Sequence, residues 1–595
     1  MEEIRAQRMS EPRDSRQNVS ERDITGFVMD STRERYQRLS WQGGFAEYLK
    51  LVAADPYRHT RTAYQLVRDM LLSFGVEEYE DNGETVKHFK LFDDPFNDGK
   101  NRIFGIERTV QKLVQVIEAG AKEEGKERII VLHGPVGTAK TSIVDLISRG
   151  LEAYTSTPAG EVYTFAWRFG KDFGSEGVGG LGFGARTSGD YAGINNPVAV
   201  LPSQMHEHPL LLIPREERRE LLTRLFDAAG ISDTHIIPHK LLESELEFNS
   251  KQIYNYLIRK YEGNWLKVMD HVLVQRVQFS EGAGIGVAKV PPEGNAETAS
   301  QPVSIDENFR FIANLINNIS LVRYYGKYVH ANRGVIQYSD IFKKPANYLQ
   351  HLLGAVEEHR MDFGETGCDI DCVIAGTTNI HEYIAMRQDP VSRALRSRMR
   401  KIDVPYLRNF REEEKIYRRG LRQFKRKLKI APHTTEMAAR WAVMTRLEPT
   451  ELHKDETLDE DTRKILGKVT PALKALIYAG QFPPEFTAQE RQKLSPRVRR
   501  MLFNENKYEG MAGASTRTLQ DLFADLCEDE TVDCITPFRV FDLLEALITQ
   551  GAETLDFLAR EPDGEWFDFK GFISQLRHIY DGVLGEEIEN SIVDV

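Results

Sequence analysis

The sequence predicts an α/β fold, in which a core with a parallel sheet is flanked by a small N-terminal helical domain and a C-terminal helical region. Three observations predict this fold class. The apolar segment ERIIVLHG, residues 127–134, lies between two segments with helical periodicity, which is typical of α/β layers. Two further apolar strands, GVIQY from Gly334 and CVIAGTT from Cys372, follow later in the chain. After Tyr406 the periodicity is helical almost to the end.

The same patterns divide the chain into consecutive parts. The first 35 residues are polar and have no apolar period. Apolar residues then recur at helical steps from Leu39 to Phe74, with a break at Pro56. The expected parts are a flexible arm (1–35), an N-terminal helical domain (36–95), an α/β domain (96–406) with a glycine-rich insert (169–193), a helical lid (407–525) and a C-terminal helical segment (526–595).

Composition and charge exclude several classes of protein. With 41% hydrophobic and 28% charged residues, the chain has the composition of a soluble globular protein, and no run approaches the roughly 18 apolar residues of a membrane span. The N-terminus has no apolar secretory segment and four cysteines are too few for a disulfide framework, so we expect a cytoplasmic protein. A net charge of −12 argues against a protein that coats nucleic acid. The basic stretch Lys415–Lys429 is interpreted as a solvated helix face.

The segment HGPVGTAKT, from His133 to Thr141, joins the first apolar strand to a helix. A glycine-rich turn at this place exposes backbone N–H groups and a helix N-terminus, and both bind phosphate. Lys140 would reach the β- and γ-phosphates of ATP, and Thr141 would hold Mg²⁺. Ala139 departs from the usual pattern, which has glycine before the lysine; the alternative is a turn that binds nothing. The predicted nucleotide-binding residues are Gly134, Pro135, Val136, Gly137, Thr138, Ala139, Lys140 and Thr141.

An acidic residue should follow a neighbouring strand, where it would bind Mg²⁺ and activate water. The strand GVIQY is followed by Ser339 and Asp340. Ser339 stands where the magnesium-side aspartate is expected, and Asp340 stands where the catalytic glutamate is expected. Because Asp340 is one methylene shorter than glutamate, it would need a bridging water or a closer strand. We assign Asp340 as base and magnesium ligand, and Glu281, which follows the strand in VQRVQFSE, is the alternative.

Three later polar residues complete the pattern. Asn379 ends the strand VIAGTTN and could orient the attacking water, although an asparagine after a strand is also a common turn residue. In SRALRSRMRKIDVPY the candidates are Arg396, Arg398 and Arg400, and Arg398 could enter a neighbouring subunit's site and stabilise charge there. Arg517, near the start of a helix in EGMAGASTRTLQDL, could fold back on the nucleotide from a lid.

The order of these five features is the signature of AAA+ ATPases. It predicts ATP and Mg²⁺ as cofactors and a homo-oligomeric ring, with a hexamer favoured. In such rings the loop after the second strand commonly faces the central pore. EVYTFAW would be this strand, and Phe173, Phe183 and Tyr191 of the glycine-rich insert could grip a threaded chain. The alternative is a disordered surface insertion.

A closer resemblance is carried by stretches that span roughly residues 38–520, namely LSWQGGFAEYLKLV, the P-loop with RGLEAYT, MHEHPLLLIP, HVLVQRVQFSEGAGIG, ANRGVIQYSDIFK, TTNIHEY, RSRMRKIDVPY, EEEKIYRRG, APHTTEMAARWAVMTRL and EGMAGASTR. In these stretches the chain resembles the bacterial PrkA family, whose members are named serine protein kinases and carry an AAA+ core. The resemblance implies that Asp340 lies at the Walker B position, Asn379 at sensor 1, Arg398 near the arginine finger and Arg517 at sensor 2. It also implies von Willebrand A-domain and SpoVR-like proteins as partners.

Four features depart from the family pattern. The loop reads GPVGTAKT where the family has a sequence more like GPVSGGKS, and the glycine-rich insert looks foreign to the family. Ser203 and Gln204 replace a cysteine–proline pair. The family continues into a longer C-terminal region, whereas this chain ends at Val595, so we expect much of that region to be absent.

Three functional hypotheses follow. The favoured one is an ATPase that couples ATP binding and hydrolysis to remodelling or regulation of a protein partner. The family name implies serine/threonine kinase activity, but neither of the two DFG tripeptides, Asp172–Gly174 and Asp362–Gly364, has the companion motifs of protein kinases. The third is a nucleotide-gated scaffold that hydrolyses ATP slowly, because the acidic position is shortened to Asp340.

Overall fold

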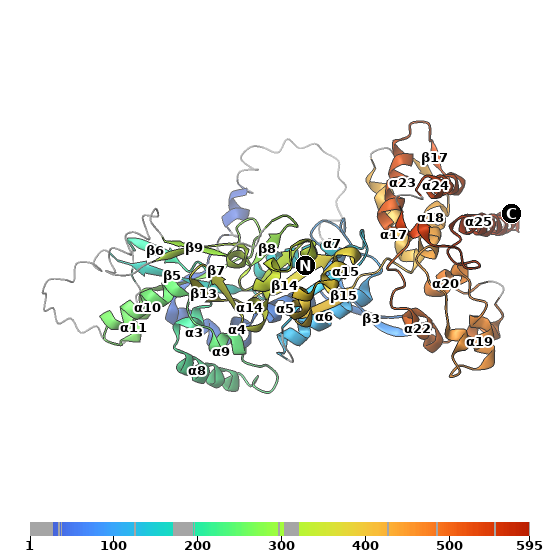
Figure 1. Ribbon diagram of the computed structural model, residues 1–595. Coiled ribbons are helices and arrows are strands. Elements are labelled where there is room, and N and C mark those ends of the chain that lie inside the picture. Colours follow the sequence, from blue (N-terminus) through green and yellow to red (C-terminus); the bar gives the residue numbers. More distant parts are fainter. Residues whose placement is uncertain are drawn as a thin grey trace, which may run out of the picture.

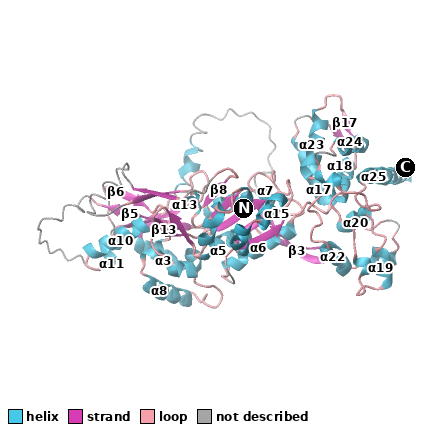
Figure 2. Ribbon diagram, viewed as in Figure 1, coloured by secondary structure: helices cyan, strands magenta, loops and turns pink. Residues whose placement is uncertain are grey.

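The computed structural model describes residues 26, 28–33, 36, 39–123, 127–170, 194, 197–294, 298–302, 321–424, 428–483, 486–551 and 555–593. Figure 1 shows three regions in a row. A group of strands around β5 and β6 lies at one end, a central sheet lies around β14 and β15, and a group of helices from α17 to α25 lies at the other end. Figure 2 shows that most strands lie in the first two regions and that the third is built almost entirely from helices.

The central sheet has five strands, all parallel to their neighbours, in the order β15-β4-β14-β11-β8. This arrangement confirms the predicted α/β fold class with a parallel sheet. Helix α7 (Lys140–Thr155) follows β4 directly through the P-loop, as a strand-to-helix connection in such a fold requires. The strands are β4 (Ile129–His133), β8 (Val287–Val290), β11 (Val335–Tyr338), β14 (Val373–Thr378) and β15 (Met399–Asp403).

Strand β4 is buried on both faces. Its side chains alternate, so that Ile130 and Leu132 pack in one apolar cluster and Ile129 and Val131 in another. The first cluster contains side chains of α5 (Ala63–Ser73), α6 (Glu107–Ala121) and α7, and the second contains side chains of α13 (Lys327–Ala331) and α14 (His351–Glu357). Helices therefore cover both faces of the sheet, and this explains why the strand sequence is continuously apolar.

A second sheet is antiparallel and has the order β1-β7-β5-β6. It contains the segment EVYTFAW, as β5 (Val162–Phe169), so the prediction that this segment is the second strand of the nucleotide-binding core is wrong. Strand β8 holds the place beside β11 instead. The prediction was wrong because β5 has an apolar sequence like that of a core strand, and in the structure it is nearly as continuously buried as β4. Residues 171–193 of the glycine-rich insert, with Phe173, Phe183 and Tyr191, lie outside the described residues.

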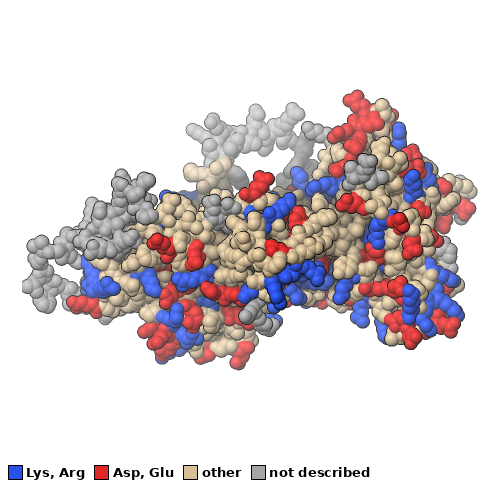
Figure 3. Space-filling view, in the orientation of Figure 1, with Lys and Arg blue, Asp and Glu red and all other residues tan. Residues whose placement is uncertain are grey.

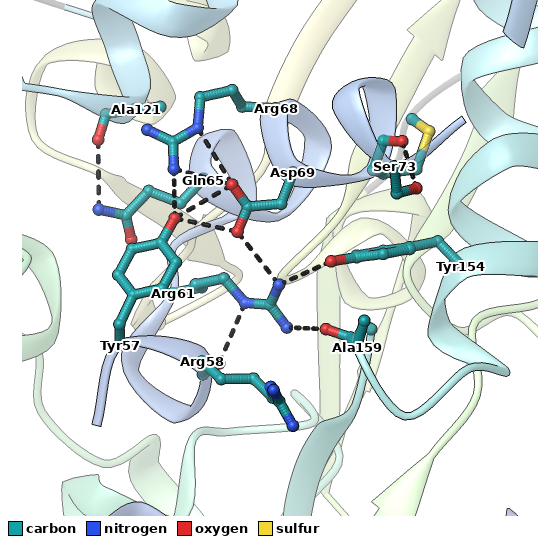
Figure 4. A network of polar contacts seen from close by, with 12 residues as sticks. Tyr57, Arg58, Arg61, Gln65, Arg68, Asp69, Ser73, Ala121, Tyr154 and Ala159 are labelled. Atoms are coloured by element: carbon teal, nitrogen blue, oxygen red, sulfur yellow. Dashed lines mark hydrogen bonds and ion pairs between the residues drawn. The ribbon is translucent and has the colours of Figure 1, made fainter. Parts of the chain in front are cut away.

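The N-terminal helices are α3 (Phe45–Ala54), α4 (Pro56–Thr60) and α5, and Pro56 begins α4 at the predicted break. Figure 4 shows the polar network that ties α4 and α5 to the P-loop helix. The Arg61 guanidinium donates to Asp69 of α5 (3.2 Å), to the Tyr154 hydroxyl of α7 (3.0 Å) and to the Ala159 carbonyl (2.8 Å). Helices α4 and α5 are therefore fixed against the far end of α7.

The C-terminal part is built around α18 (Thr434–Met444), most of whose residues are buried. Two-residue strands, β16 (Lys429–Ile430) and β17 (Cys534–Ile535), are paired in parallel here, a pairing that the helical pattern did not predict. The other helices are α17 (Phe410–Gln423), α19 (Glu460–Leu466), α20 (Pro471–Tyr478), α21 (Ala488–Lys493), α22 (Pro496–Glu505), α23 (Thr516–Glu528), α24 (Pro537–Gln550) and α25 (Phe569–Val593).

One fully buried ion pair joins the C-terminal helices to the core. The Arg446 guanidinium donates to both carboxylate oxygens of Glu413 on α17, at 3.0 and 2.8 Å. It also donates to the Leu407 carbonyl (2.9 Å) and to the Ala514 carbonyl (2.8 Å). Arg446 therefore connects the segment that leaves the sheet, helix α17 and the loop before α23.

The described surface carries both signs of charge. On the face shown in Figure 3, acidic and basic side chains are interspersed, and no single sign covers the whole face. Among the residues with described positions, no helix has the length and apolar character that a membrane crossing needs.

We predict that Arg446→Met destabilises the C-terminal helices by about 3–5 kcal/mol, because it leaves the Glu413 carboxylate buried without its partner. Urea denaturation measures this free energy of unfolding. The matched control is Lys464→Met, which breaks an exposed pair with Glu460 and should leave the denaturation midpoint unchanged. Equal midpoints for the two variants would contradict the role assigned to Arg446.

Candidate nucleotide-binding site

The P-loop begins at the carboxyl end of β4 and is packed tightly against the next strand. A Cβ atom at Gly134 would lie 2.1 Å from the Val404 carbonyl oxygen, so a side chain cannot be accommodated there. The Gly134 N–H donates to the Thr378 carbonyl (3.3 Å), and the Tyr406 hydroxyl donates to the Val136 carbonyl (2.8 Å). The loop is therefore held from both neighbouring strands of the sheet.

The residue before the P-loop lysine adopts a left-handed conformation. Ala139 has φ +59° and precedes the first residue of α7, and Gly137 has φ +87°. Glycine adopts this region without a steric cost, whereas a residue with a Cβ is strained there by about 1–2 kcal/mol. This backbone explains why the usual loop pattern has glycine at the position of Ala139.

The Lys140 side chain is buried and folded back onto the loop. Its ammonium group donates to the carbonyls of Gly134 (2.9 Å) and Pro135 (2.5 Å). Burial lowers its pKa to about 8, against the opposing effect of the Asp340 and Glu382 carboxylates. Both carboxylates therefore lie close enough to the P-loop lysine to act on its charge.

The register of the sheet brings the predicted polar residues to one edge. His133 of β4 is opposite Thr378 of β14, and Gly376 of β14 is opposite Tyr338 of β11. Gly134, Asn379 and Asp340 therefore follow their strands at nearly the same level, at the carboxyl edge of the sheet. Ligands of open parallel α/β sheets bind at this edge.

Asp340 lies at this edge, and Glu281 does not. The Asp340 N–H donates to the Thr377 hydroxyl (3.1 Å), and its carboxylate pairs with Lys343 (3.0 Å). Glu281 follows β7 (Val272–Val277) of the antiparallel sheet, and its N–H donates to the Glu152 carboxylate (2.6 Å). Glu152 is twelve residues beyond Lys140 in α7, about 18 Å along the helix axis.

Asn379 ends β14 and precedes helix α15 (Ile380–Gln388). Its side-chain amide donates to the Glu382 carboxylate at 3.4 Å, and its backbone N–H donates to the other oxygen of that carboxylate at 3.1 Å. Asn379, the predicted sensor 1 residue, is therefore accompanied by a second carboxylate, which no motif in the sequence had indicated.

Arg398 lies at the opposite edge of the sheet. Its carbonyl accepts a hydrogen bond from the N–H of Ile129, the first residue of β4, and its guanidinium pairs with Glu357 (2.6 Å). The five residues of β15 span about 16 Å, so Arg398 cannot reach the P-loop of its own chain. The structure does not bring it together with the other predicted site residues.

Arg517 lies beside the P-loop, near the start of α23. Its Cβ is 3.9 Å from the position that a Cβ of Gly137 would occupy. Both residues line a cavity of about 270 Å³ between the P-loop, the segment before α6 and helices α17 and α23. Its lining includes Gly137, Thr138, Ala139, Ser142, Tyr406, Leu407, Ile416, Thr516, Arg517 and Gln520.

The sequence did not identify the cations that complete this cavity. Lys100, Arg102 and Arg419 line it together with Arg517, and none of the described residues in its lining carries a carboxylate. The guanidiniums of Arg102 and Arg419 lie 5.1 and 5.0 Å from the centre of the Phe104 ring. The interpretation of the basic stretch as only a solvated face is therefore corrected for Arg419. Lys100 and Arg102 are close together in the sequence, which could have indicated a basic site. Only the fold brings this basic pair beside Arg419 of α17.

Two curated relatives are similar over much of the chain. The ATP-dependent protease PrkA of Bacillus subtilis (strain 168) is 25% identical over 574 residues, which cover 95% of this chain and 75% of that protein. The serine/threonine kinase YeaG of Escherichia coli (strain K12) is 21% identical over 443 residues, which cover 71% of this chain. The chain spans 58% of the length of YeaG in this match.

Among solved structures, NtrX from Brucella abortus in complex with ADP is similar at 11% sequence identity, over 63% of this chain and 75% of the NtrX chain. The TM-score is 0.19. A score this low supports no conclusion about the fold or the ligand of this protein.

Two family models match the chain. The PrkA AAA domain matches residues 43–167 and 193–454, a range that includes the P-loop and the ends of β11 and β14. The PrkA serine protein kinase C-terminal domain matches residues 473–595, so sequence of this domain is present after the AAA domain. The chain therefore belongs to the PrkA family, with an AAA domain followed by a PrkA C-terminal domain.

Proposed function

We propose that this protein binds and hydrolyses ATP and uses the cycle to remodel or regulate a protein partner. One observation carries the proposal: the P-loop borders a cavity to which Lys100, Arg102, Arg419 and Arg517 contribute positive charge, with no carboxylate among its described lining residues. Such a cavity attracts a polyanion. The P-loop itself presents N–H groups and the N-terminus of α7 to a phosphate.

The residues at the sheet edge have the chemistry that phosphoryl transfer needs. Lys140 would leave the loop carbonyls and pair with the β- and γ-phosphates. The exposed Thr141 hydroxyl and the Asp340 carboxylate are oxygen donors of the kind that Mg²⁺ prefers, and the ion would neutralise charge on the phosphates. Asp340 would accept the proton of the attacking water, and the Asn379 amide would orient that water.

Slow hydrolysis by a nucleotide-gated scaffold is a second candidate, and the Asp340 contacts support it. Its carboxylate is short and already paired with Lys343 at 3.0 Å. Asp340 would therefore have to exchange Lys343 for the attacking water or for Mg²⁺ before it could act. Ser339, at the preceding position, has no carboxylate that could bind Mg²⁺ in place of Asp340.

A ring of subunits, with a hexamer favoured, would give Arg398 a role. It lies at the edge of the sheet opposite its own P-loop, where a neighbouring subunit's nucleotide could meet it. In the free chain Glu357 holds its guanidinium, so assembly would have to exchange that partner for a phosphate. Von Willebrand A-domain and SpoVR-like proteins remain the proposed partners.

The names of the relatives point to two different activities, proteolysis and protein phosphorylation. Both consume ATP, so the fate of the γ-phosphate separates the hypotheses. After incubation with γ-labelled ATP, label in free phosphate supports the ATPase and label on protein serine or threonine supports the kinase. ATP binding without transfer of label supports the scaffold, and no binding contradicts all three.

We predict that Lys140→Ala weakens ATP binding by about 30- to 100-fold, because it removes a charge-assisted contact to the phosphates. Isothermal titration calorimetry measures the change. Lys112→Ala, on the exposed side of α6 and away from the P-loop, is the control and should bind like the wild type. Unchanged affinity in Lys140→Ala would disprove the P-loop assignment.

We also predict that ATP binding weakens as the pH rises through about 8. Burial places the pKa of Lys140 at about 8 in the free protein, so the lysine is charged at pH 7 and increasingly neutral at higher pH. ATP should bind the charged form, and binding at about pH 9 should therefore take up a proton. Calorimetry in two buffers of different ionisation enthalpy measures this uptake, and Lys140→Ala should abolish it.

Asp340→Asn should keep ATP binding but reduce turnover at least about 100-fold, as expected for loss of a general base. The control is Glu281→Gln, which changes a carboxylate near the other end of α7 and should hydrolyse ATP at the wild-type rate. Steady-state phosphate release measures both. If Glu281→Gln were the inactive variant, the base would belong to the antiparallel sheet.

Ala139→Gly should not destabilise the protein, and the gain should be at most about 1 kcal/mol, because relief of the left-handed strain exceeds the entropic cost of glycine. Ala153→Gly, within the same helix α7, should cost about 1 kcal/mol. Thermal unfolding of the two variants gives the comparison. A loss of stability in Ala139→Gly equal to that in Ala153→Gly would show that Ala139 is helical.

A further inference from the structure

Glu382 is a carboxylate at the nucleotide edge whose position is fixed by its neighbours. It is the third residue of α15, and its two oxygens accept hydrogen bonds from the backbone N–H and the side-chain amide of Asn379, at 3.1 and 3.4 Å. The next residue, Tyr383, lies against the ring of His133 at the end of β4, with 4.7 Å between the ring centres. The first turn of α15 is therefore held against the P-loop strand.

The backbone hydrogen bond to Asn379 does not require a negative charge. A glutamine at the third position of the helix accepts the Asn379 N–H with its amide oxygen as a glutamate does. Its NH2 group cannot accept from the Asn379 side-chain amide, but it can donate to the Asn379 side-chain oxygen once that amide is turned. The charge of Glu382 is thus an additional feature of this site. It opposes the lowering of the Lys140 pKa by burial, and it adds to the effect of Asp340 in raising the pKa of Lys343.

Glu382 is bonded to Asn379, which follows β14 at the level where the P-loop follows β4, so this charge lies beside the P-loop. Lys140 is the residue that would meet the β- and γ-phosphates, and Glu382 and Asp340 are the two carboxylates that act on it. The γ-phosphate adds negative charge that ADP lacks at this place. Repulsion from a fixed carboxylate therefore weakens ATP binding more than ADP binding.

We propose that Glu382, held by Asn379, is a specificity-determining residue that shifts the nucleotide preference of this site from ATP toward ADP. The proposal rests on the proposed function, because it assumes that ATP binds at the P-loop. For unit charges several ångströms apart at a partly exposed site, the expected effect on the ratio of the ATP and ADP dissociation constants is about three- to tenfold.

The test is Glu382→Gln, which removes the charge and keeps an oxygen that accepts the Asn379 backbone N–H. ATP should bind about three- to tenfold more tightly than to the wild type, ADP affinity should change less than about twofold, and the melting temperature should be unchanged. Glu358→Gln is the control, since it makes the same charge change at an exposed residue after α14 and should leave both affinities unaltered.

The possible failures are distinguishable. If the wild type binds neither nucleotide, both the proposed function and this inference are contradicted. If the wild type binds and hydrolyses ATP but Glu382→Gln keeps the wild-type ratio of ATP and ADP affinities, the inference alone is overturned. The same holds if ATP and ADP tighten equally, or if Glu358→Gln produces the same shift.

Discussion

The parallel pairing of β4 with β15 on one side and β14 on the other is the constraint on which the site depends. Because all five strands of this sheet run in one direction, the groups that follow β4, β14 and β11 meet at one edge. The same pairing packs Gly134 against the Val404 carbonyl so closely that no side chain fits. Burial of β4 on both faces provides the apolar contacts that hold this arrangement.

The cavity beside the P-loop is lined in part by the C-terminal helices α17 and α23. Arg446 connects these helices to the segment that follows β15. Its guanidinium contacts the Leu407 carbonyl, the Glu413 carboxylate and the Ala514 carbonyl, three groups that lie far apart in the sequence. Leu407 lines the cavity, and Ala514 shortly precedes Arg517. Arg446 therefore ties α17, which carries Arg419, to the loop that leads to Arg517.

The balance of charge differs sharply between the two ends of the site. The charged side chains that line the cavity beside Gly137 are all cations, of which Arg102 is paired with Asp93, whereas near the Lys140 ammonium two carboxylates, Asp340 and Glu382, contribute negative charge. The phosphates of a bound nucleotide would therefore be attracted by the cations of the cavity and repelled by these two carboxylates.

The sequence alone determined the elements whose chemistry is local: the P-loop after an apolar strand, the polar residues that end two other strands, and the family to which the chain belongs. It did not determine which strands share a sheet, because β5 and β4 are both apolar and buried and local periodicity does not encode a strand's partners. The roles of Arg419 and Glu382 likewise escaped it. A charged residue on a helix has the same pattern whether it faces solvent or a cavity, and only tertiary packing brings Arg419 to Phe104 and Glu382 to the P-loop lysine.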